Sequence, residues 1–365
     1  MRSAPARLPT VVLSLIPALR NSAAALCLGA CFLAATARAD LVWTPQTGWR
    51  VEGGALSGLA GPEGRNALDQ MNKARTEEER GSTRSAYKAY ERIAKKYPNA
   101  IYAPEALYRA ARLHLTRKEY NKAFDDFQQV LARYPNTKRF NEITGEQYRI
   151  ASALLDGARG RMFFGLLPGF KQRDKAIEYF ETILVNAPYS DYAPLSLMNI
   201  ARGHQKQGQT EEAIDALDRM VNSYSQSLLA PDAYLKLAQT HASLVDGPYY
   251  DQGATKESIT YYTDFMLLYP SDTNVAVAEK GLDHMKTMLA ESKMKIGDFY
   301  FYKRDNFKAA RVFYNEAITA YPDSQIAARA KVRLVEVEAK AGGQPAPDAP
   351  AAPAAAPKKK RFWLF

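Results

Sequence analysis

The sequence contains only two cysteines in 365 residues, Cys27 and Cys31, and both lie in an apolar N-terminal stretch. The body of the chain therefore has no thiols for a disulfide framework or a cysteine-ligated metal. The four histidines fall one to a predicted helix, which argues against a metal site. A Gly-rich phosphate loop and a Gly-x-Ser-x-Gly motif are also absent. We therefore predict a protein that is not an enzyme and uses no cofactor or metal.

A concentration of one charge in the body is also lacking. The formal net charge is +10, but much of the excess lies at the two ends of the chain. Such a mildly basic body gives no reason to expect nucleic acid as a partner. The charged content of 24% and hydrophobic content of 47% are those of a folded protein. The length requires either several domains or a repeat array.

The first 39 residues have the order of a signal peptide. Arginines precede an apolar run, and Ala37-Arg38-Ala39 follows it. This order predicts export, with cleavage after Ala39 and Asp40 as the first mature residue. A second interpretation stays open, because Leu28-Gly29-Ala30-Cys31 resembles a lipobox in which Cys31 would be lipidated.

Residues 40–65 are rich in glycine and show no helical periodicity, so we predict an extended segment or linker. Trp43 and Trp49 are its most distinctive side chains. They would anchor either on a partner or on the first helices, or else belong to a mobile segment.

Residues 103–136 read as two short amphipathic helices joined by a polar turn and ended by Tyr134-Pro135. One such hairpin cannot bury its apolar face alone, whereas stacked copies can. The copies share a register, since twelve residues separate the alanine and the proline in Ala86–Pro98, Ala123–Pro135, Ala176–Pro188 and Ala310–Pro322. Proline ends each helix because its ring blocks helical geometry at the preceding residue.

This register predicts an all-α fold, a tetratricopeptide-like α-solenoid of stacked helix hairpins over residues 66–340. It would contain five to six repeats and a capping helix over 327–340. Insertions at 157–173 and 245–256 interrupt two of the repeats, and we expect partners to bind near them.

The first insertion is apolar and flanked by basic residues. It would dip into a membrane interface or dock on a partner, or else fold back over the repeats. Its candidate contact residues are Phe163, Phe164, Leu166, Leu167 and Phe170.

Residues 341–365 form an Ala/Pro-rich linker followed by a basic and aromatic tail. Cations beside Phe362, Trp363 and Phe365 would adhere to anionic lipid or to a protein pocket. The alternative is a solvated tail.

The last third of the chain contains Tyr269-Pro270-Ser271, then Gly297-Asp298-Phe299-Tyr300, then Ala309-Ala310 and Tyr314. With these motifs it resembles the BamD family (also called YfiO) of outer-membrane assembly lipoproteins, and the hairpins resemble the tetratricopeptide repeat. That family shows a Tyr-Pro-Ser stop and a long helix, then a G-x-F-Y helix and an A-A-x-x-x-Y helix.

The resemblance implies a protein-binding scaffold at the periplasmic face of the outer membrane. By its implication, residues 66–188 would present a groove to the terminal segment of an unfolded outer-membrane protein. Residues 231–340 would dock on the barrel-forming subunit. The alternative function is a periplasmic adaptor of envelope constriction or peptidoglycan synthesis, of the TolA-binding type. Its usual coiled coil is not found in this sequence.

Overall fold

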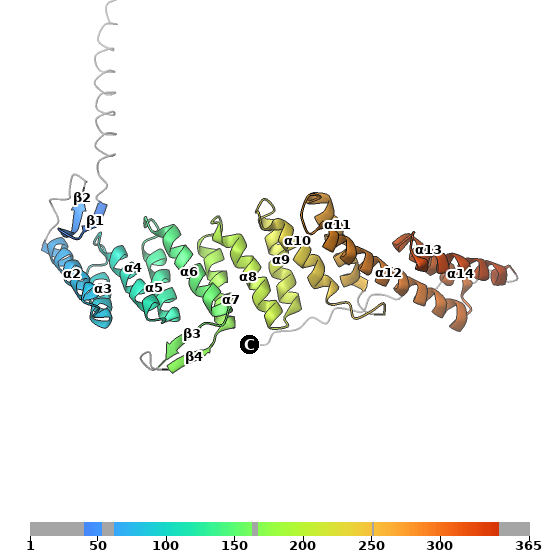
Figure 1. Cartoon of the computed structure of the whole chain (residues 1–365), viewed down its shortest axis with the longest axis horizontal. Coiled ribbons are helices and arrows are strands. Elements are labelled where there is room, and N and C mark those ends of the chain that lie inside the picture. The colour runs from blue at the N-terminus through green and yellow to red at the C-terminus, as the bar shows by residue number, and fades with distance from the viewer. Residues whose placement is uncertain (1–39, 53–61, 163–166, 250–251, 343–365) are drawn as a thin grey trace, which may run out of the picture. The chain divides into compact units, whose positions relative to one another are not determined.

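The computed structural model describes residues 40–52, 62–162, 167–249 and 252–342, and these residues are mostly helical (Figure 1). Thirteen helices follow one another within the described ranges. Most have 13 to 18 residues, whereas α12 has 29. In chain order they are α2 (Pro62–Glu79), α3 (Thr83–Lys96), α4 (Ala103–Thr116), α5 (Tyr120–Arg133), α6 (Phe140–Leu155), α7 (Arg173–Asn186), α8 (Tyr192–Lys206), α9 (Thr210–Ser223), α10 (Ala230–Ala242), α11 (Gln252–Leu268), α12 (Val275–Lys303), α13 (Phe307–Ala320) and α14 (Gln325–Ala341).

Successive helices pack as antiparallel hairpins, because each has one apolar face that only a neighbour can cover. An alanine near the start of each second helix allows close approach. Five of these alanines are completely buried: Ala86, Ala123, Ala176, Ala213 and Ala310. The prediction of an all-α tetratricopeptide-like solenoid is confirmed.

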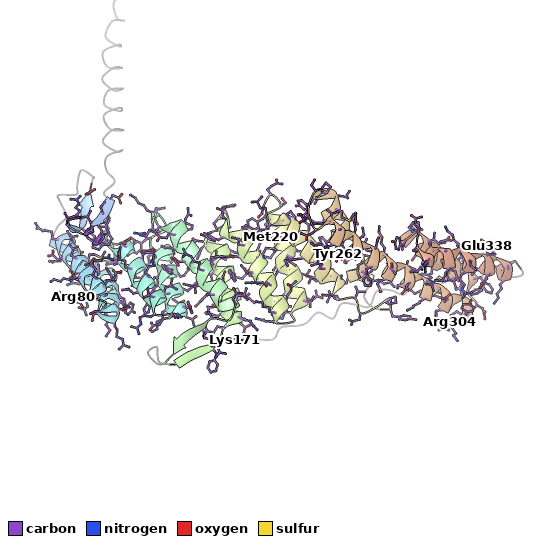
Figure 2. The ribbon with its side chains drawn as sticks, in the orientation of Figure 1. Arg80, Lys171, Met220, Tyr262, Arg304 and Glu338 are labelled. Carbon is purple, nitrogen blue, oxygen red and sulfur yellow. The ribbon has the colours of Figure 1, made fainter. Side chains whose placement is uncertain are left out.

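The chain divides into two compact units. The first comprises Met1–Ile150 with Gly157–Lys171, and the second Ala151–Asp156 with Gln172–Phe365. Each has its own core. The buried side chains of Met71, Tyr90 and Ile93 belong to a cluster of the first unit. Two clusters in the second unit centre on Phe265 and Tyr314. Met220 and Tyr262, both labelled in Figure 2, are buried in the second unit.

Tyr-Pro dipeptides shape the turns between repeats. The N–H of Tyr97 still bonds to the carbonyl of Ile93, and Pro98 then prevents the helix from continuing. The hydroxyl of Tyr134 donates to the carbonyl of Pro98 at 2.7 Å. This bond joins the turn before α4 to the turn before α6.

Within the segment predicted to be extended, residues 40–52 form a β-hairpin. Strands β1 (Asp40–Thr44) and β2 (Gly48–Glu52) pair antiparallel, with Asp40 opposite Glu52 and Trp43 opposite Trp49. Gly48 has a φ of +68°, and a Cβ there would lie 2.7 Å from Oδ1 of Asn72. Helix α2 begins at Pro62, before the predicted start of the repeats.

The insertion at 157–173 also contains a hairpin. Strands β3 (Arg159–Met162) and β4 (Leu167–Lys171) pair antiparallel with a break in register near Arg161. The insertion at 245–256 is partly helical, because α11 starts at Gln252.

The long helix and the Gly297–Tyr300 segment, predicted as separate helices, form the single helix α12. Two glycines on it lie against aromatic rings. A Cβ on Gly281 would lie 2.3 Å from Tyr262, and one on Gly297 would lie 2.7 Å from Tyr314. Because these glycines have no side chain, α11 packs closely against Gly281 and α13 against Gly297. Among the described residues, no helix combines the length and apolarity needed to cross a bilayer.

Candidate protein-binding surfaces

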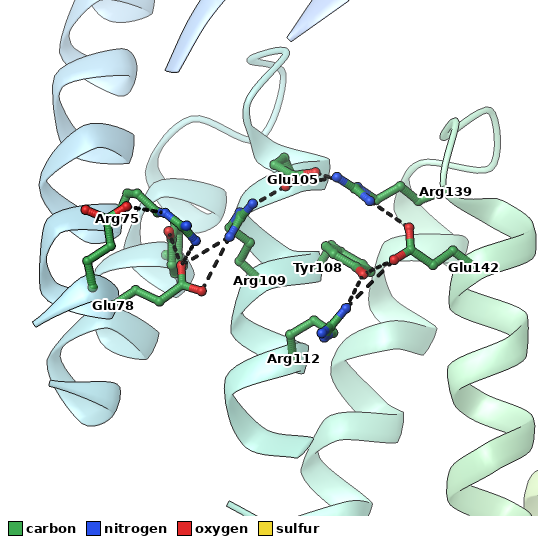
Figure 3. A network of polar contacts seen from close by, with 10 residues as sticks. Arg75, Glu78, Glu105, Tyr108, Arg109, Arg112, Arg139 and Glu142 are labelled. Atoms are coloured by element: carbon green, nitrogen blue, oxygen red, sulfur yellow. Dashed lines mark hydrogen bonds and ion pairs between the residues drawn. The ribbon is translucent and has the colours of Figure 1, made fainter. Parts of the chain in front are cut away.

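A series of ion pairs connects the first helices of three successive repeats in the first unit (Figure 3). On α2, Glu78 lies 3.2 Å from Arg75 and 3.3 Å from Arg109 of α4. The hydroxyl of Tyr90 donates to Glu78 at 2.8 Å. The carboxylate therefore joins three helices, α2, α3 and α4.

The series continues from α4 to α6. Glu105 accepts from Nε of Arg109 at 3.0 Å and from Nε of Arg139 at 2.7 Å. Arg139 also donates to Glu142 at 2.6 Å, and Tyr108 donates to the same carboxylate. We call the set Arg75, Glu78, Arg109, Glu105, Arg139 and Glu142 the ion-pair ladder.

The ladder is partly buried, and this makes its pairing important. The side chain of Glu105 is only 9% exposed, so its charge requires partners. Burial opposes the charge of Arg139, but Glu105 and Glu142 outweigh it and raise the pKa of the guanidinium. Burial likewise opposes the charge of Glu142, whereas hydrogen bonds from Tyr108 and Arg139 lower its pKa. Removing one member would leave another charge buried without compensation.

The β1–β2 hairpin packs against this ladder. Trp49 is 4% exposed, and Arg109 lies 4.8 Å from the centre of its ring. Arg75 lies 4.4 Å from the ring of Trp43. The N–H of Trp49 donates to Oδ1 of Asn72 at 2.8 Å. Both tryptophans therefore lie on the first helices of their own unit, one of the alternatives considered from the sequence.

The start of β1 reaches the turn after α5. Nζ of Lys138 lies 2.5 Å from Oδ2 of Asp40. This hydrogen bond lowers the pKa of Asp40. A cavity of about 400 Å³ lies between the turn before α4 and the turn before α6, and Asp40 and Leu41 form part of its wall. We call it turn groove 1.

A second cavity, of about 810 Å³, lies in the second unit between the turns that precede α8 and α10. We call it turn groove 2. Its wall includes Tyr189 and Leu228, which are 100% and 98% exposed. A third cavity, of about 520 Å³, lies between α12 and α14 and is lined by charged residues and Val332.

Two histidines occupy equivalent positions in their repeats. Nδ1 of His114 lies 2.6 Å from Glu119, and Nδ1 of His204 lies 2.8 Å from Oε1 of Gln209. Burial lowers the pKa of His114 despite the neighbouring Glu119. Each histidine thus fastens the turn that follows its helix. Within the described ranges, no three His, Cys, Asp or Glu side chains are grouped so that they could hold a metal ion.

Asp126 is a largely buried carboxyl, 19% exposed, that the sequence did not single out. It faces the opposite side of the His114 ring, 3.6 Å from Nε2. Burial, and then the charge of Glu91, raise the pKa of Asp126 to about 7. The sequence did carry a signal for Asp126, because the next repeats have apolar residues at its position.

The contact residues predicted from the sequence are only partly described. Phe170, in β4, is 78% exposed. Leu167 lies in the same strand, but its side chain is outside the described set. Asp40 is the first described residue. The remaining candidates lie outside the described residues and stay predictions: Cys31, Ala39, Phe163, Phe164, Leu166, Phe362, Trp363 and Phe365.

Solved structures with similar helical arrangements include MamA from Desulfovibrio magneticus, with 19% identity, 59% of this chain and 99% of that chain covered, and a TM-score of 0.29. A tetratricopeptide repeat protein from Parabacteroides merdae has 12% identity, covers 75% of this chain and 99% of its own, and gives a TM-score of 0.31. The assignment of the fold rests instead on the helix pairs and on the sequence models below.

Residues 171–349 match the model of the YfiO family, described as outer membrane lipoprotein. Residues 70–100 and 105–137 match a tetratricopeptide repeat model. The chain is 28% identical over 164 residues to the outer membrane protein assembly factor BamD of Caulobacter vibrioides, which covers 45% of this chain and 53% of the relative. It is 28% identical over 166 residues to BamD of Rickettsia prowazekii, which covers 46% of this chain and 66% of the relative. The match thus spans between about half and two thirds of the length of these relatives. The chain is therefore similar to the BamD family over residues 171–349, and its first helices match the tetratricopeptide repeat.

Proposed function

We propose that this chain is a non-catalytic, periplasm-facing scaffold in the machinery that assembles β-barrel proteins into the outer membrane. The observation that carries this proposal is the match of residues 171–349 to the outer membrane lipoprotein family. The similarity to two BamD proteins, which are named assembly factors, supports it. A repeat array suits the role, because stacked hairpins present long surfaces to protein partners.

The face of α2, α4 and α6 is the proposed site for the terminal segment of an unfolded outer-membrane protein. The ladder keeps these helices in a fixed arrangement, so the surface is formed before a client arrives. The β1–β2 hairpin covers part of this face. A client would therefore bind beside the hairpin or displace it.

The last repeat is the proposed docking site for the barrel-forming subunit. Four large side chains on α12 and α14 are between 46% and 67% exposed: Phe299, Tyr302, Val332 and Val335. The adjoining cavity is lined by residues of both charges, including Lys295, Asp298 and Arg333. An apolar centre with a polar rim is typical of protein interfaces.

Crosslinking in cells followed by affinity purification tests this function. We expect the barrel-forming subunit to be recovered, and recovery of cell-wall synthases alone would contradict the proposal. The double variant Val332→Glu and Val335→Glu should reduce the yield at least tenfold. Val185→Glu is the matched control, because Val185 is 79% exposed but lies on α7.

We further propose that the chain is anchored or released according to how its leader is processed. Mass spectrometry of the mature N-terminus distinguishes the two products. A lipidated Cys31 would indicate a lipoprotein, and an N-terminal Asp40 would indicate cleavage after Ala39.

A further inference from the structure

The two turn grooves are built alike, with corresponding residues separated by 90 positions. In the two turns that border groove 1, the hydroxyl of Tyr134 donates to the carbonyl of Pro98 at 2.7 Å. In groove 2 the hydroxyl of Tyr224 donates to the carbonyl of Pro188, also at 2.7 Å. Pro104 and Pro194 occupy the same place in the walls of the two grooves. The backbone frame of one groove is therefore a guide to what fits the other.

Groove 1 takes an extended piece of its own chain. Asp40 and Leu41 belong to β1, and both line the groove. The carboxylate of Asp40 pairs with Lys138 at 2.5 Å, and Leu41 packs against the core of the first unit. The backbone frame of groove 1 thus holds strand β1, and Asp40 of that strand is complementary in charge to Lys138 of the turn before α6.

The side chains of groove 2 differ where that match is made. Leu228 stands at the position of Lys138, and Leu229 stands at that of Arg139. Of the residues that line groove 2, Asp191 alone is charged, and several serines and Gln226 offer hydrogen-bonding groups. The side chain that pairs with a cation in groove 1 would meet an aliphatic surface here.

We propose that turn groove 2 binds an extended segment of a partner protein, with an aliphatic or aromatic side chain where groove 1 holds Asp40. That side chain lies against Leu228 and Tyr189, and the exposed hydroxyl and amide groups bond to the peptide backbone. Burying the exposed leucine and tyrosine favours binding. The inference requires only a protein-binding scaffold, so it stands apart from the proposed role in outer-membrane assembly.

A specificity swap tests the proposal on the full-length mature chain. The probes are two fluorescein-labelled peptides of residues 40–44, one with the natural sequence and one with Asp40→Leu. We expect the apolar probe to bind the native chain at least tenfold more tightly than the natural one. Leu228→Lys recreates the residue of groove 1 and should reverse this preference.

The control variant is Leu267→Lys, which introduces the same charge at another exposed leucine, on α11. It should leave the preference unchanged. Any binding of the probes to groove 1 is common to all three proteins and therefore cancels in the comparison. Equal affinities for the two probes, or no effect of Leu228→Lys, would overturn the proposal.

Two other occupants give different results. If the C-terminal tail fills the groove, the double variant Phe362→Ser and Trp363→Ser will bind the apolar probe more tightly than the native chain. If a second copy fills it, sedimentation will show a dimer that Leu228→Lys dissociates. Either result would rule out a partner segment as the natural occupant.

Discussion

The two units use different interactions between neighbouring repeats. In the first unit, carboxylates and guanidiniums link the first helices, and tryptophans lie over two of the arginines. In the second unit, a neutral hydrogen bond from Gln205 to Thr240 links the first helices α8 and α10. The ion pair of that unit between Arg219 and Glu181 links the second helices α9 and α7 instead. Glycines at 281 and 297 allow close aromatic packing there. The first unit covers its ladder with its own hairpin, whereas the second leaves apolar side chains available to partners.

The largest effect is expected from Trp49→Ala in the first unit. Removing this buried ring should cost about 3–5 kcal/mol of the unfolding free energy. Hydrogen exchange should rise in α2–α4 and remain unchanged in α12–α14. Tyr189→Ala is the control in the second unit, where a fully exposed side chain is replaced and the change should stay within about 0.5 kcal/mol. If Trp49→Ala raised hydrogen exchange equally in both units, the proposed difference between them would be contradicted.

Glu105→Leu should destabilise the first unit by about 2 kcal/mol, because Arg109 and Arg139 would lose their shared carboxylate. Leu195 occupies the equivalent position in the second unit. The triple variant with Arg109→Asn and Arg139→Leu converts all three positions to the residues of the second unit. It should be more stable than the single variant in urea unfolding. A triple variant that is less stable than Glu105→Leu would show that uncompensated charge is not the cause of the loss.

Asp126 makes the first unit sensitive to pH. Burial raises the pKa of this carboxyl to about 7, so the fold favours its protonated form. The associated stability is complete below the ordinary carboxyl pKa of 3.8 and is lost as the pH rises through 7. Asp126→Asn should therefore stabilise the first unit by about 1–2 kcal/mol at pH 8, and by much less at pH 4.5. An equal gain at both values, measured by urea unfolding, would exclude titration of Asp126 as the cause.

The smallest expected effect is that of salt. Raising the concentration of NaCl from 0.05 to 1 M should weaken the first unit by about 0.5 kcal/mol, because the outer members of the ladder are screened. The second unit should lose less, because its ion pair between Arg219 and Glu181 is 41% and 39% exposed and contributes little. Hydrogen exchange resolved by helix separates the two responses. A larger loss in the second unit would reverse the comparison.

The sequence predicted the repeats well, because the spacing of alanine and proline is a local signal that stacking preserves. The register located four second helices, α3, α5, α7 and α13, which carry Ala86, Ala123, Ala176 and Ala310. The β1–β2 hairpin was missed, since its stability depends on Trp49 and Asn72 meeting across the fold. The ladder was missed for the same reason. Glu105 and Arg139 are 34 residues apart, and nothing in their local sequence shows that they pair.

The β1–β2 hairpin has a mechanical consequence. Asp40 and Glu52 lie opposite each other at the open end of the hairpin, so tension between these ends would break its hydrogen bonds one pair at a time. Unzipping of this kind needs less force than shearing all the pairs at once. Trp43 and Trp49 form the fourth of the five pairs from the open end, and their rings lie against Arg75 and Arg109. In a product lipidated at Cys31, a pull on the residues before Asp40 would therefore load the hairpin before the helices.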